Sequence, residues 1–145
     1  MLRTPVLERP SDAVQCETGY RVIFGDTDAM GIVYYANYLR LFELGRSELM
    51  RHLGIPYGPL FESGILMPIV EQWWRYRAPA RFDDWLRILT WGHEIGRTSI
   101  LVGCEVYRED VLIGQGACRL ACMDREGRLR KLPSELLQFR KEGAT

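Results

Sequence analysis

Two carboxylates stand one residue apart in a glycine-flanked segment between a strand-like run and a long helical pattern. These are Asp26 and Asp28, and Gly25 and Gly31 flank them. The N-terminus of a helix presents unpaired backbone N–H groups and a partial positive charge, which suit an oxyanion. A carboxylate beside such donors has the components of acyl chemistry. One group attacks or activates water, and the other stabilises the developing negative charge.

A metal loop and a simple turn are the other interpretations of this segment. An EF-hand loop that begins at Asp26 requires Asp or Asn at the position of Met30 and Glu at the position of Asn37, so the calcium interpretation fails. A magnesium site needs phosphate-binding partners, which the segment does not show. In an Asx-turn each carboxylate only caps a loop amide, and this is the common structural alternative.

A long helical pattern follows the carboxylates. From Asn37 to about Leu53, apolar residues recur at spacings of three and four, which predicts an amphipathic helix. Asn37 is the expected N-cap, and Gly54 stands where a left-handed residue ends a helix. Gly45 lies within the apolar stripe and costs helix propensity, so we expect another backbone to approach the helix closely there.

Most of the remaining chain has the pattern of strands. A short strand is expected from Tyr20 to Phe24, and longer ones over 66–76, 85–91, 100–106 and 111–123, the last bent or bulged around Gly114 and Gly116. Turns at 96–97 and 108–110, a last strand over 128–132 and a short closing helix over 133–137 complete the pattern. Hairpin-connected strands form an antiparallel sheet against which one long apolar helix must pack. The sequence therefore predicts an α+β fold with an antiparallel sheet wrapped around a central helix.

Length and composition favour one small domain. The chain has 145 residues, of which 47% are apolar, and this suits a single core. We expect residues 1–16 to form a poorly ordered lead-in and residues 17–145 to form the domain. The longest stretch without Asp, Glu, Lys or Arg runs from Ala29 to Leu39, which is too short for a bilayer span of about 20 residues. Because the start of the chain is not a secretory signal, the sequence predicts a cytoplasmic protein.

Charge and cysteine usage exclude several classes of function. The 19 Lys and Arg residues balance 19 Asp and Glu residues, which argues against a nucleic-acid binder. The 4 cysteines form no CxxC pair and have no nearby histidine, so no metal site is expected. Cys118 and Cys122 are expected to share one face of a strand and fill the core. His93 is expected to be a surface or packing residue, and nothing in the chain matches a dinucleotide fingerprint.

Two blocks of the sequence match a known family. The matching residues are Asp26-Thr27-Asp28, Gly31-Ile32-Val33-Tyr34-Tyr35, Asn37-Tyr38 and Glu43-x-x-Arg46 in the first block, and Tyr76-x-x-Pro79-Ala80-Arg81-x-Asp83-Asp84 in the second. With these residues the chain resembles the 4-hydroxybenzoyl-CoA thioesterase family and its bacterial acyl-CoA thioesterase relatives associated with the Tol-Pal system. The likeness covers about residues 20–132. It implies the hotdog fold, which is the helix-wrapped antiparallel sheet expected above.

The resemblance also implies an activity. It is the hydrolysis of an acyl-CoA thioester to a free acid and CoA, without a metal or a redox cofactor. The resemblance assigns the catalytic carboxylate to Asp28, as nucleophile on the thioester or as base for water, and the main oxyanion donor to the backbone N–H of Tyr35. The Tol-Pal relatives have a histidine at the position of Tyr35, so the chain resembles the hydroxybenzoyl branch there. Asp26 is expected to hold the loop. A homodimer or homotetramer, with active sites at the subunit interface, is also implied.

The sequence also predicts roles or positions for several charged and aromatic side chains. CoA carries phosphate charges, so its binding surface should offer cations. The candidates are Arg97, Arg128, Arg130 and Lys131, although ordinary solvated charge is an alternative role for each of them. Glu43 and Arg46 are expected to face each other as a surface pair, and the Trp73-Trp74 pair is expected to place one indole on each face of its strand.

Two other functions stay open at this point. One is a thioesterase that acts on acyl groups held by acyl carrier protein. The other is a hotdog protein that binds acyl-CoA without hydrolysing it, or that serves as an assembly scaffold. The acyl group also stays open, because aromatic, short-chain and medium-chain thioesters all fit the sequence.

Overall fold

A five-stranded sheet and one long helix form the framework of the described chain. The computed structural model describes residues 8–140, so residues 1–7 of the expected lead-in and residues 141–145 of the expected domain lie outside it. The strands are β1 (Gln15–Arg21), β2 (Ile69–Tyr76), β3 (Trp85–Ile95), β4 (Ser99–Arg108) and β5 (Val111–Ala121). The helices are α1 (Asn37–His52), α2 (Tyr57–Glu62) and α3 (Ser134–Leu137), and a 3-10 turn, η1, spans Phe24–Asp26.

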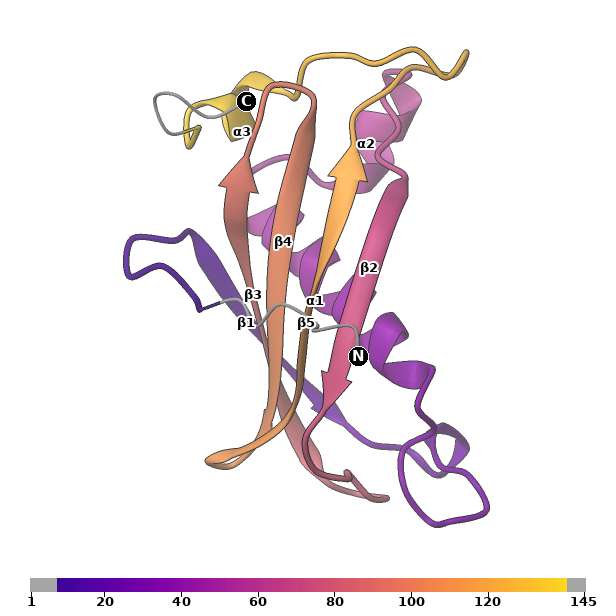
Figure 1. Cartoon of the computed structure of the whole chain (residues 1–145). Helices are drawn as coiled ribbons and strands as arrows, with labels where there is room; N and C mark the ends of the chain where they lie inside the picture. The colour runs from indigo at the N-terminus through magenta and orange to yellow at the C-terminus, as the bar shows by residue number, and fades with distance from the viewer. Residues whose placement is uncertain (1–7, 141–145) are drawn as a thin grey trace, which may run out of the picture.

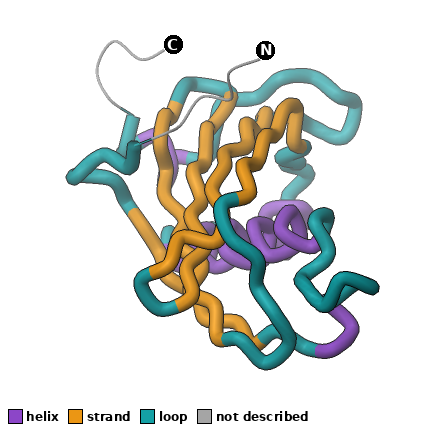
Figure 2. The backbone as a smooth tube through the Cα atoms, turned by 60° about the horizontal axis from the view of Figure 1, so that its bottom comes forward, coloured by secondary structure: helices purple, strands orange, loops and turns teal. Residues whose placement is uncertain are grey.

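The strands form one sheet in the order β1-β3-β4-β5-β2, and every neighbouring pair is antiparallel. Strands β3, β4 and β5 follow one another through the two hairpins, while β1 and β2 stand at the edges. Helix α1 crosses one face of the curved sheet, and α2 and α3 lie near one end of it (Figure 1, Figure 2). The predicted α+β class, with an antiparallel sheet wrapped around a central helix, is confirmed.

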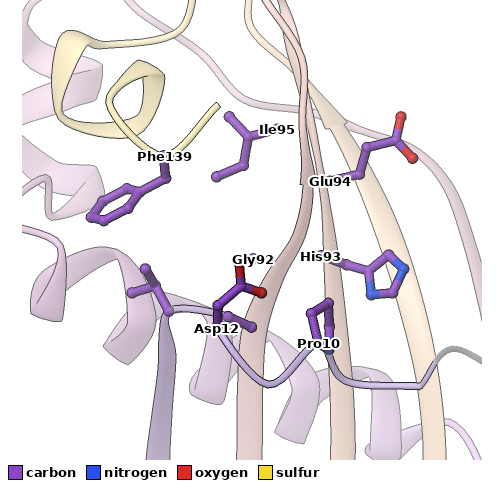
Figure 3. A pocket seen from close by; sticks show the side chains of 9 residues that line it. Pro10, Asp12, Gly92, His93, Glu94, Ile95 and Phe139 are labelled. Atoms are coloured by element: carbon purple, nitrogen blue, oxygen red, sulfur yellow. The ribbon is translucent and has the colours of Figure 1, made fainter. Parts of the chain in front are cut away.

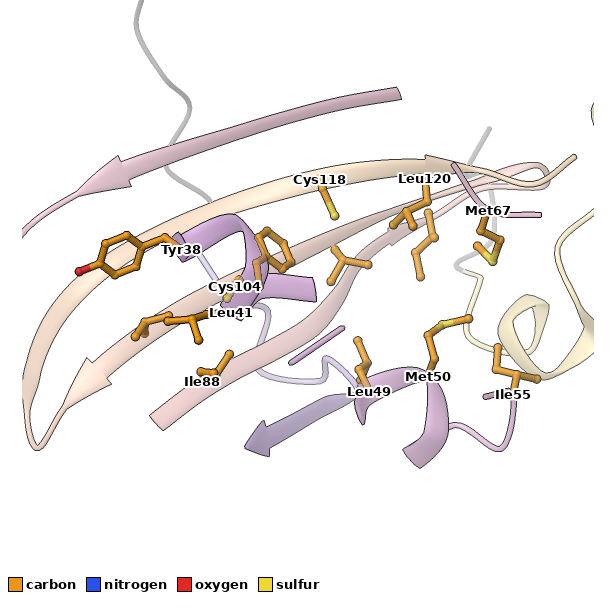
Figure 4. Close-up of a cluster of buried hydrophobic side chains, with 14 of the residues drawn as sticks. Tyr38, Leu41, Leu49, Met50, Ile55, Met67, Ile88, Cys104, Cys118 and Leu120 are labelled. Carbon is orange, nitrogen blue, oxygen red and sulfur yellow. The ribbon is translucent and has the colours of Figure 1, made fainter. Parts of the chain in front are cut away.

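Gly45 lies where α1 packs tightly on β3. A Cβ atom at this position would lie 2.6 Å from Ile88 Cγ2 and 2.9 Å from Thr90 Cγ2, both on β3. The Thr90 hydroxyl donates a hydrogen bond of 3.1 Å to the Gly45 carbonyl oxygen. The expected close approach at this glycine is therefore made by side chains of β3 and not by another backbone. The core fills the layer between α1 and the strands, where the side chains of Leu41 and Leu49 face those of Ile88 and Leu120 (Figure 4).

The ends of α1 agree only in part with the sequence pattern. Gly54 follows the helix with a φ of 82°, as a left-handed terminal residue should. The N-cap is Ala36 rather than Asn37, and it makes no side-chain cap. The Asn37 side chain instead donates a hydrogen bond of 2.9 Å to the Asp26 carbonyl oxygen. The Asn37 side chain therefore fastens the preceding loop and does not cap the helix.

Arg46 departs most clearly from its expected place. The residue is 5% exposed, although the helical pattern put it on the polar side. Its Nε donates to the Tyr57 hydroxyl at 3.2 Å, and its Nη1 donates to Cys118 Sγ at 3.5 Å. None of the ion pairs among residues 8–140 joins it to Glu43, so the expected surface pair is wrong. The buried guanidinium group therefore has hydrogen-bond partners from α2 and β5.

One strand boundary and two further elements also differ. β1 begins at Gln15, inside the expected lead-in, and ends at Arg21, after which the Val22 N–H donates to the Asp84 carbonyl oxygen at 2.9 Å. The expected strand over 128–132 is wrong, because this segment makes only an isolated bridge at Leu129. Helix α2 was not expected, since Pro56 and Pro59 suggested a stop. Pro59 lies in the first turn, where a missing N–H costs little.

The other strands are present with shifted ends, since β2 begins at Ile69, β3 runs to Ile95 and β5 ends at Ala121. Both hairpins, the closing helix and the irregularity near Gly114 are present. Cys118 and Cys122 are fully buried in the core, and Trp74 packs into it through contacts with Tyr38 and Phe42. In the part of the chain that the structure describes, no helix is long and apolar enough to cross a membrane.

Candidate active site

Asp26 fastens the loop between β1 and α1. Its carboxylate is 5% exposed and accepts hydrogen bonds from the Tyr20 hydroxyl at 2.8 Å and from the Ile23 N–H at 2.9 Å. Its carbonyl oxygen accepts from the N–H of Tyr34 at 2.8 Å and from the Asn37 side chain. With both groups committed, Asp26 supports the loop, as the sequence predicted, and has little capacity left for chemistry.

Asp28 lies in a tight turn with one carboxylate oxygen engaged and one available. Its Oδ1 accepts from the Met30 N–H at 2.8 Å, and its carbonyl oxygen accepts from the N–H of Gly31, whose φ is 78°. The Asx-turn considered from the sequence is therefore present. Among residues 8–140, Oδ2 has no hydrogen-bond partner. The turn thus holds the side chain in place without consuming both of its oxygens.

Tyr35 immediately precedes the residue that caps α1. The backbone N–H groups of Tyr35 and Ala36 donate to no acceptor within the described chain. Both groups lie just before the first turn of α1, where the helix dipole adds a partial positive charge. Two adjacent unpaired donors at a helix start form a place where a developing negative charge is stabilised.

A cavity of about 420 Å³ brings Asp28 and Tyr35 together. Its opposite wall comes from the end of β2 and the residues after it, which a hydrogen bond of 2.8 Å from the Val33 N–H to the Ala80 carbonyl oxygen fastens to the loop. The lining is mostly apolar and aromatic: Asp28, Met30, Ile32, Val33, Tyr35, Tyr38, Tyr76, Arg77, Ala78 and Pro79. Asp28 and Tyr35 thus line one pocket that is suited to an apolar group.

Tyr38, Tyr76 and Arg77 are lining residues that the sequence analysis did not assign to the site. Burial raises the pKa of the Tyr38 phenol, so the ring stays neutral at physiological pH. Tyr76 opens the second motif block, and its place in that block was the signal that could have identified it. The two blocks therefore form opposite walls of one cavity.

The expected CoA-binding cations lie at the other end of the sheet. Arg97 occupies the turn between β3 and β4, whereas the Asp28 loop lies beside the start of β3 (Figure 1). The 11 residues of β3 separate the two ends by about 33 Å at ~3.3 Å per residue. Lys131 and Arg130 lie near Arg97, since the Leu132 N–H donates to the Arg97 carbonyl oxygen at 2.8 Å. Within one chain these cations and Asp28 do not come together.

Two of these arginines are engaged by a carboxylate. Arg128 Nε and Arg130 Nη2 lie 2.9 and 2.7 Å from Asp124 Oδ2. The N–H groups of Arg128 and Glu126 donate to Asp124 Oδ1 at 2.9 and 3.0 Å. These contacts, the backbone N–H of Arg128 foremost, lower the pKa of Asp124 to about 2.

The depressed pKa of Asp124 predicts a pH-dependent contribution to stability. An unfolded Asp titrates near 3.9, so this contribution is present above about pH 4 and is lost as the pH falls towards 2. We expect Asp124→Asn to lose less stability than the wild type between pH 5 and pH 2. Urea unfolding at both pH values checks this difference. Equal losses in the two proteins would contradict the assigned role.

A second cavity, of about 280 Å³, lies near the opposite end of β3. All four of Ile95, Phe139, His93 and Glu94 line this cavity. The side chains of Ile95 and Phe139 lie on one side of β3, and those of His93 and Glu94 lie on its other side (Figure 3). His93 Nδ1 accepts a hydrogen bond of 3.2 Å from Trp91 Nε1, so its imidazole helps to satisfy a buried indole. This arrangement agrees with the packing role expected for His93.

The buried thiols of β4 and β5 are poor candidates for a nucleophile. Burial raises the pKa of the Cys104 and Cys118 thiols, and the neighbouring Arg46 offsets only part of this effect at Cys118. Such thiols remain protonated and unreactive. The described chain gathers no group of three His, Cys, Asp or Glu side chains that could hold a metal ion.

Comparisons with known proteins identify the family and the fold. The model of the thioesterase-like superfamily matches residues 22–139. The acyl-CoA thioester hydrolase YbgC of Escherichia coli O6:H1 is 31% identical over 105 residues, which cover 72% of this chain and 78% of that protein. The structure of BH1999 gentisyl-coenzyme A thioesterase has a TM-score of 0.80 at 29% identity and covers 84% of this chain and 99% of its own. The 4-hydroxybenzoyl CoA thioesterase from Pseudomonas sp. strain CBS-3 has a TM-score of 0.78 at 27% identity and covers 87% and 99% of the two chains. The family match over most of the length, together with these two neighbours, shows that the chain has the hotdog fold and belongs to the thioesterase-like superfamily.

Proposed function

We propose that this protein is a cytoplasmic, homo-oligomeric acyl-CoA thioesterase with Asp28 and the backbone N–H of Tyr35 at its centre. The observation that carries the proposal is the cavity of about 420 Å³ in which both residues meet. One oxygen of Asp28 and the N–H of Tyr35 have no partner within residues 8–140. Relatives named as acyl-CoA thioester hydrolases give independent support for the substrate class.

The chemistry needs only these two groups and water. Asp28 attacks the thioester carbon, or removes a proton from a water molecule that attacks it, and the carbonyl oxygen becomes negative. The Tyr35 N–H at the start of α1 stabilises that oxyanion. The intermediate collapses by breaking the carbon–sulfur bond, and CoA leaves as a thiolate. When water attacks, this step gives the free acid directly. When Asp28 attacks, it leaves an anhydride between the acyl group and Asp28, which water then hydrolyses to the free acid and the regenerated carboxylate. Because a thiol has a pKa of about 8.5, this leaving group needs little protonation, and no general acid is required.

The lining of the cavity favours a flat, apolar acyl group. Tyr35, Tyr38 and Tyr76 contribute three aromatic rings, and Ile32 and Val33 add branched aliphatic surface. The solved neighbours named for gentisyl and 4-hydroxybenzoyl thioesters support the same preference. We therefore propose an aromatic acyl-CoA as the preferred substrate, and short-chain and medium-chain acyl-CoA as poorer ones.

Strand β2 supports the oligomeric part of the proposal. It is an edge strand, and Ile69 and Val70 on it are 41% and 56% exposed. A bare apolar edge is a template for pairing with another strand. If β2 pairs with its copy around a two-fold axis normal to the sheet, the two strands run antiparallel. The far end of one chain then lies beside the Asp28 end of the other.

This arrangement gives the distant cations a role. Arg97, Arg128, Arg130 and Lys131 lie at the far end of the sheet from Asp28 in one chain, and in the dimer the second copy would bring its own set to the Asp28 cavity. The acyl group would then bind beside Asp28 of one subunit while the CoA phosphates meet cations of the other. The proposed site is complete only in the oligomer.

A charged substitution on the edge strand β2 tests whether the protein dimerises through this strand. We expect Val70→Asp to raise the dimer dissociation constant at least about tenfold, because pairing would bury an unpaired carboxylate. Sedimentation equilibrium measures this constant. Val111→Asp is the matched control, since Val111 is 44% exposed but starts β5 at the hairpin. A Val70→Asp protein that dimerises as well as the control would contradict pairing through β2.

A panel of substrates tests the function. We expect free thiol to be released from 4-hydroxybenzoyl-CoA faster than from butyryl-CoA or octanoyl-CoA, and each acyl group is also presented on acyl carrier protein. Faster release from the carrier protein would favour the carrier-protein thioesterase. Tight binding of acyl-CoA without thiol release would show a non-catalytic binding or scaffold protein. Either result would overturn the proposal.

A further inference from the structure

Tyr76 makes a contact across the cavity that the chemistry above does not use. Its hydroxyl donates a hydrogen bond of 3.0 Å to the carbonyl oxygen of Tyr35. The two residues are separated by 41 positions in the chain, and they come from opposite walls of the cavity. Tyr76 stands at the end of β2 and is 51% exposed, so the bond is not a by-product of core packing.

The carbonyl oxygen that Tyr76 engages belongs to the peptide group between Tyr35 and Ala36. A peptide group is planar, with its C=O and N–H pointing in opposite directions, so holding one end fixes the other. The preceding peptide group is held in the same way, because the Asn37 N–H donates to the Tyr34 carbonyl oxygen at 2.9 Å. The two bonds together set the direction of the free N–H groups of Tyr35 and Ala36.

The Tyr35 side chain does not anchor these peptide groups. Tyr35 is 61% exposed, and its ring contacts the ring of Tyr34, which is 41% exposed. Without the bond to Tyr76, the peptide group after Tyr35 would be free to rotate at the exposed end of the loop. A donor that must reorient during the reaction stabilises the oxyanion less than one already in place.

A column of aromatic rings holds Tyr76 itself in position. The ring of Tyr76 contacts Tyr38 edge-on, with centroids 5.6 Å apart. Tyr38 stacks on Trp74 at 5.9 Å, and Trp74 packs against Phe42 at 6.0 Å. Tyr38 and Phe42 belong to α1, whereas Trp74 and Tyr76 belong to β2. The column fixes the first turns of the helix against the strand that carries the Tyr76 hydroxyl.

We infer that Tyr76 is a positioning residue that orients the peptide group between Tyr35 and Ala36, so that the Ala36 N–H serves as a second oxyanion donor beside that of Tyr35. The inference rests on the proposed function, since Tyr76 has this task only if the Ala36 N–H donates to the thioester oxygen beside the Tyr35 N–H. The hydroxyl acts through the backbone and touches no reacting atom. It therefore favours the transition state and leaves ground-state binding of substrate unchanged.

The test removes only the hydroxyl. We expect Tyr76→Phe to lower kcat about fivefold to tenfold, because the variant loses one neutral hydrogen bond that matters most in the transition state. KM should stay within about twofold of the wild type, as should the dissociation constant of a non-hydrolysable thioether analogue of the substrate. The melting temperature should stay close to that of the wild type, since the ring keeps its contact with Tyr38.

Two further variants keep the result interpretable. Tyr107→Phe is the matched control, because its hydroxyl donates a bond of 2.9 Å to Glu105 away from the cavity, and we expect wild-type kinetics. A kcat of Tyr76→Phe within twofold of the wild type would overturn the inference. Weaker binding of the thioether analogue in step with kcat would also overturn it, by showing direct contact with substrate. A fully active Asp28→Asn would contradict the proposed function, whereas an inactive Asp28→Asn beside a fully active Tyr76→Phe would contradict only the role of Tyr76.

Discussion

Asp28→Asn is expected to lower the turnover of acyl-CoA by about 10²-fold or more, since it removes the nucleophile or general base. The amide oxygen of asparagine can still accept the Met30 N–H, which Asp28 Oδ1 accepts at 2.8 Å. The turn that ends at Gly31 should therefore survive, and the loss should appear in kcat with little change in folding. The rate of free thiol release from the best acyl-CoA of the panel, measured at saturating substrate, gives kcat for both proteins.

Two neighbouring carboxylates serve as controls for this substitution. Asp83 is exposed and adopts a φ of 71°, a conformation that asparagine tolerates well, so Asp83→Asn should be as active as the wild type. Asp26→Asn should reduce stability, because a neutral amide would replace the buried carboxylate that holds Tyr20 and Ile23. Unchanged thiol release by Asp28→Asn would contradict the proposed site, whatever the result for Asp26.

The half of the site that is local in sequence could be predicted from the sequence. The glycine-flanked loop before the helical pattern already placed a carboxylate beside a helix start, and the resemblance to the family then singled out Asp28 and Tyr35. The strands and α1 were predictable for a similar reason, since period-two and helical patterns report on burial along single elements. The amide at the start of α1 follows from chain order alone.

The other wall of the cavity could not be predicted, because it depends on tertiary contacts. Tyr76 reaches Tyr35 only because the loop is fastened to Ala80 and β2 ends beside it. The burial of Arg46 is a similar case. Its hydrogen-bond partners Tyr57 and Cys118 come from α2 and β5, and a helical pattern of apolar residues contains no information about either. The same limit applies to the cations near Arg97, because a sequence pattern does not give their distance from Asp28 along β3.

Gly45→Val is expected to be the most destabilising of these substitutions, with a loss of about 3 kcal/mol in the free energy of unfolding. The new Cβ would lie 2.6 Å from Ile88 Cγ2 and 2.9 Å from Thr90 Cγ2, and the strand behind these groups is hydrogen-bonded on both sides. The small gain in helix propensity over glycine does not offset that overlap. For a domain of this size the loss corresponds to a fall in melting temperature of roughly 6–12 °C, which differential scanning calorimetry resolves. Gly25→Val is the matched control, because a Cβ there meets only Ile23 Cδ1 at 4.0 Å, and it should change the melting temperature little. If the two variants melted alike, α1 could not be seated on β3 through Gly45, and the start of the helix would lose the support that holds its free amides beside Asp28.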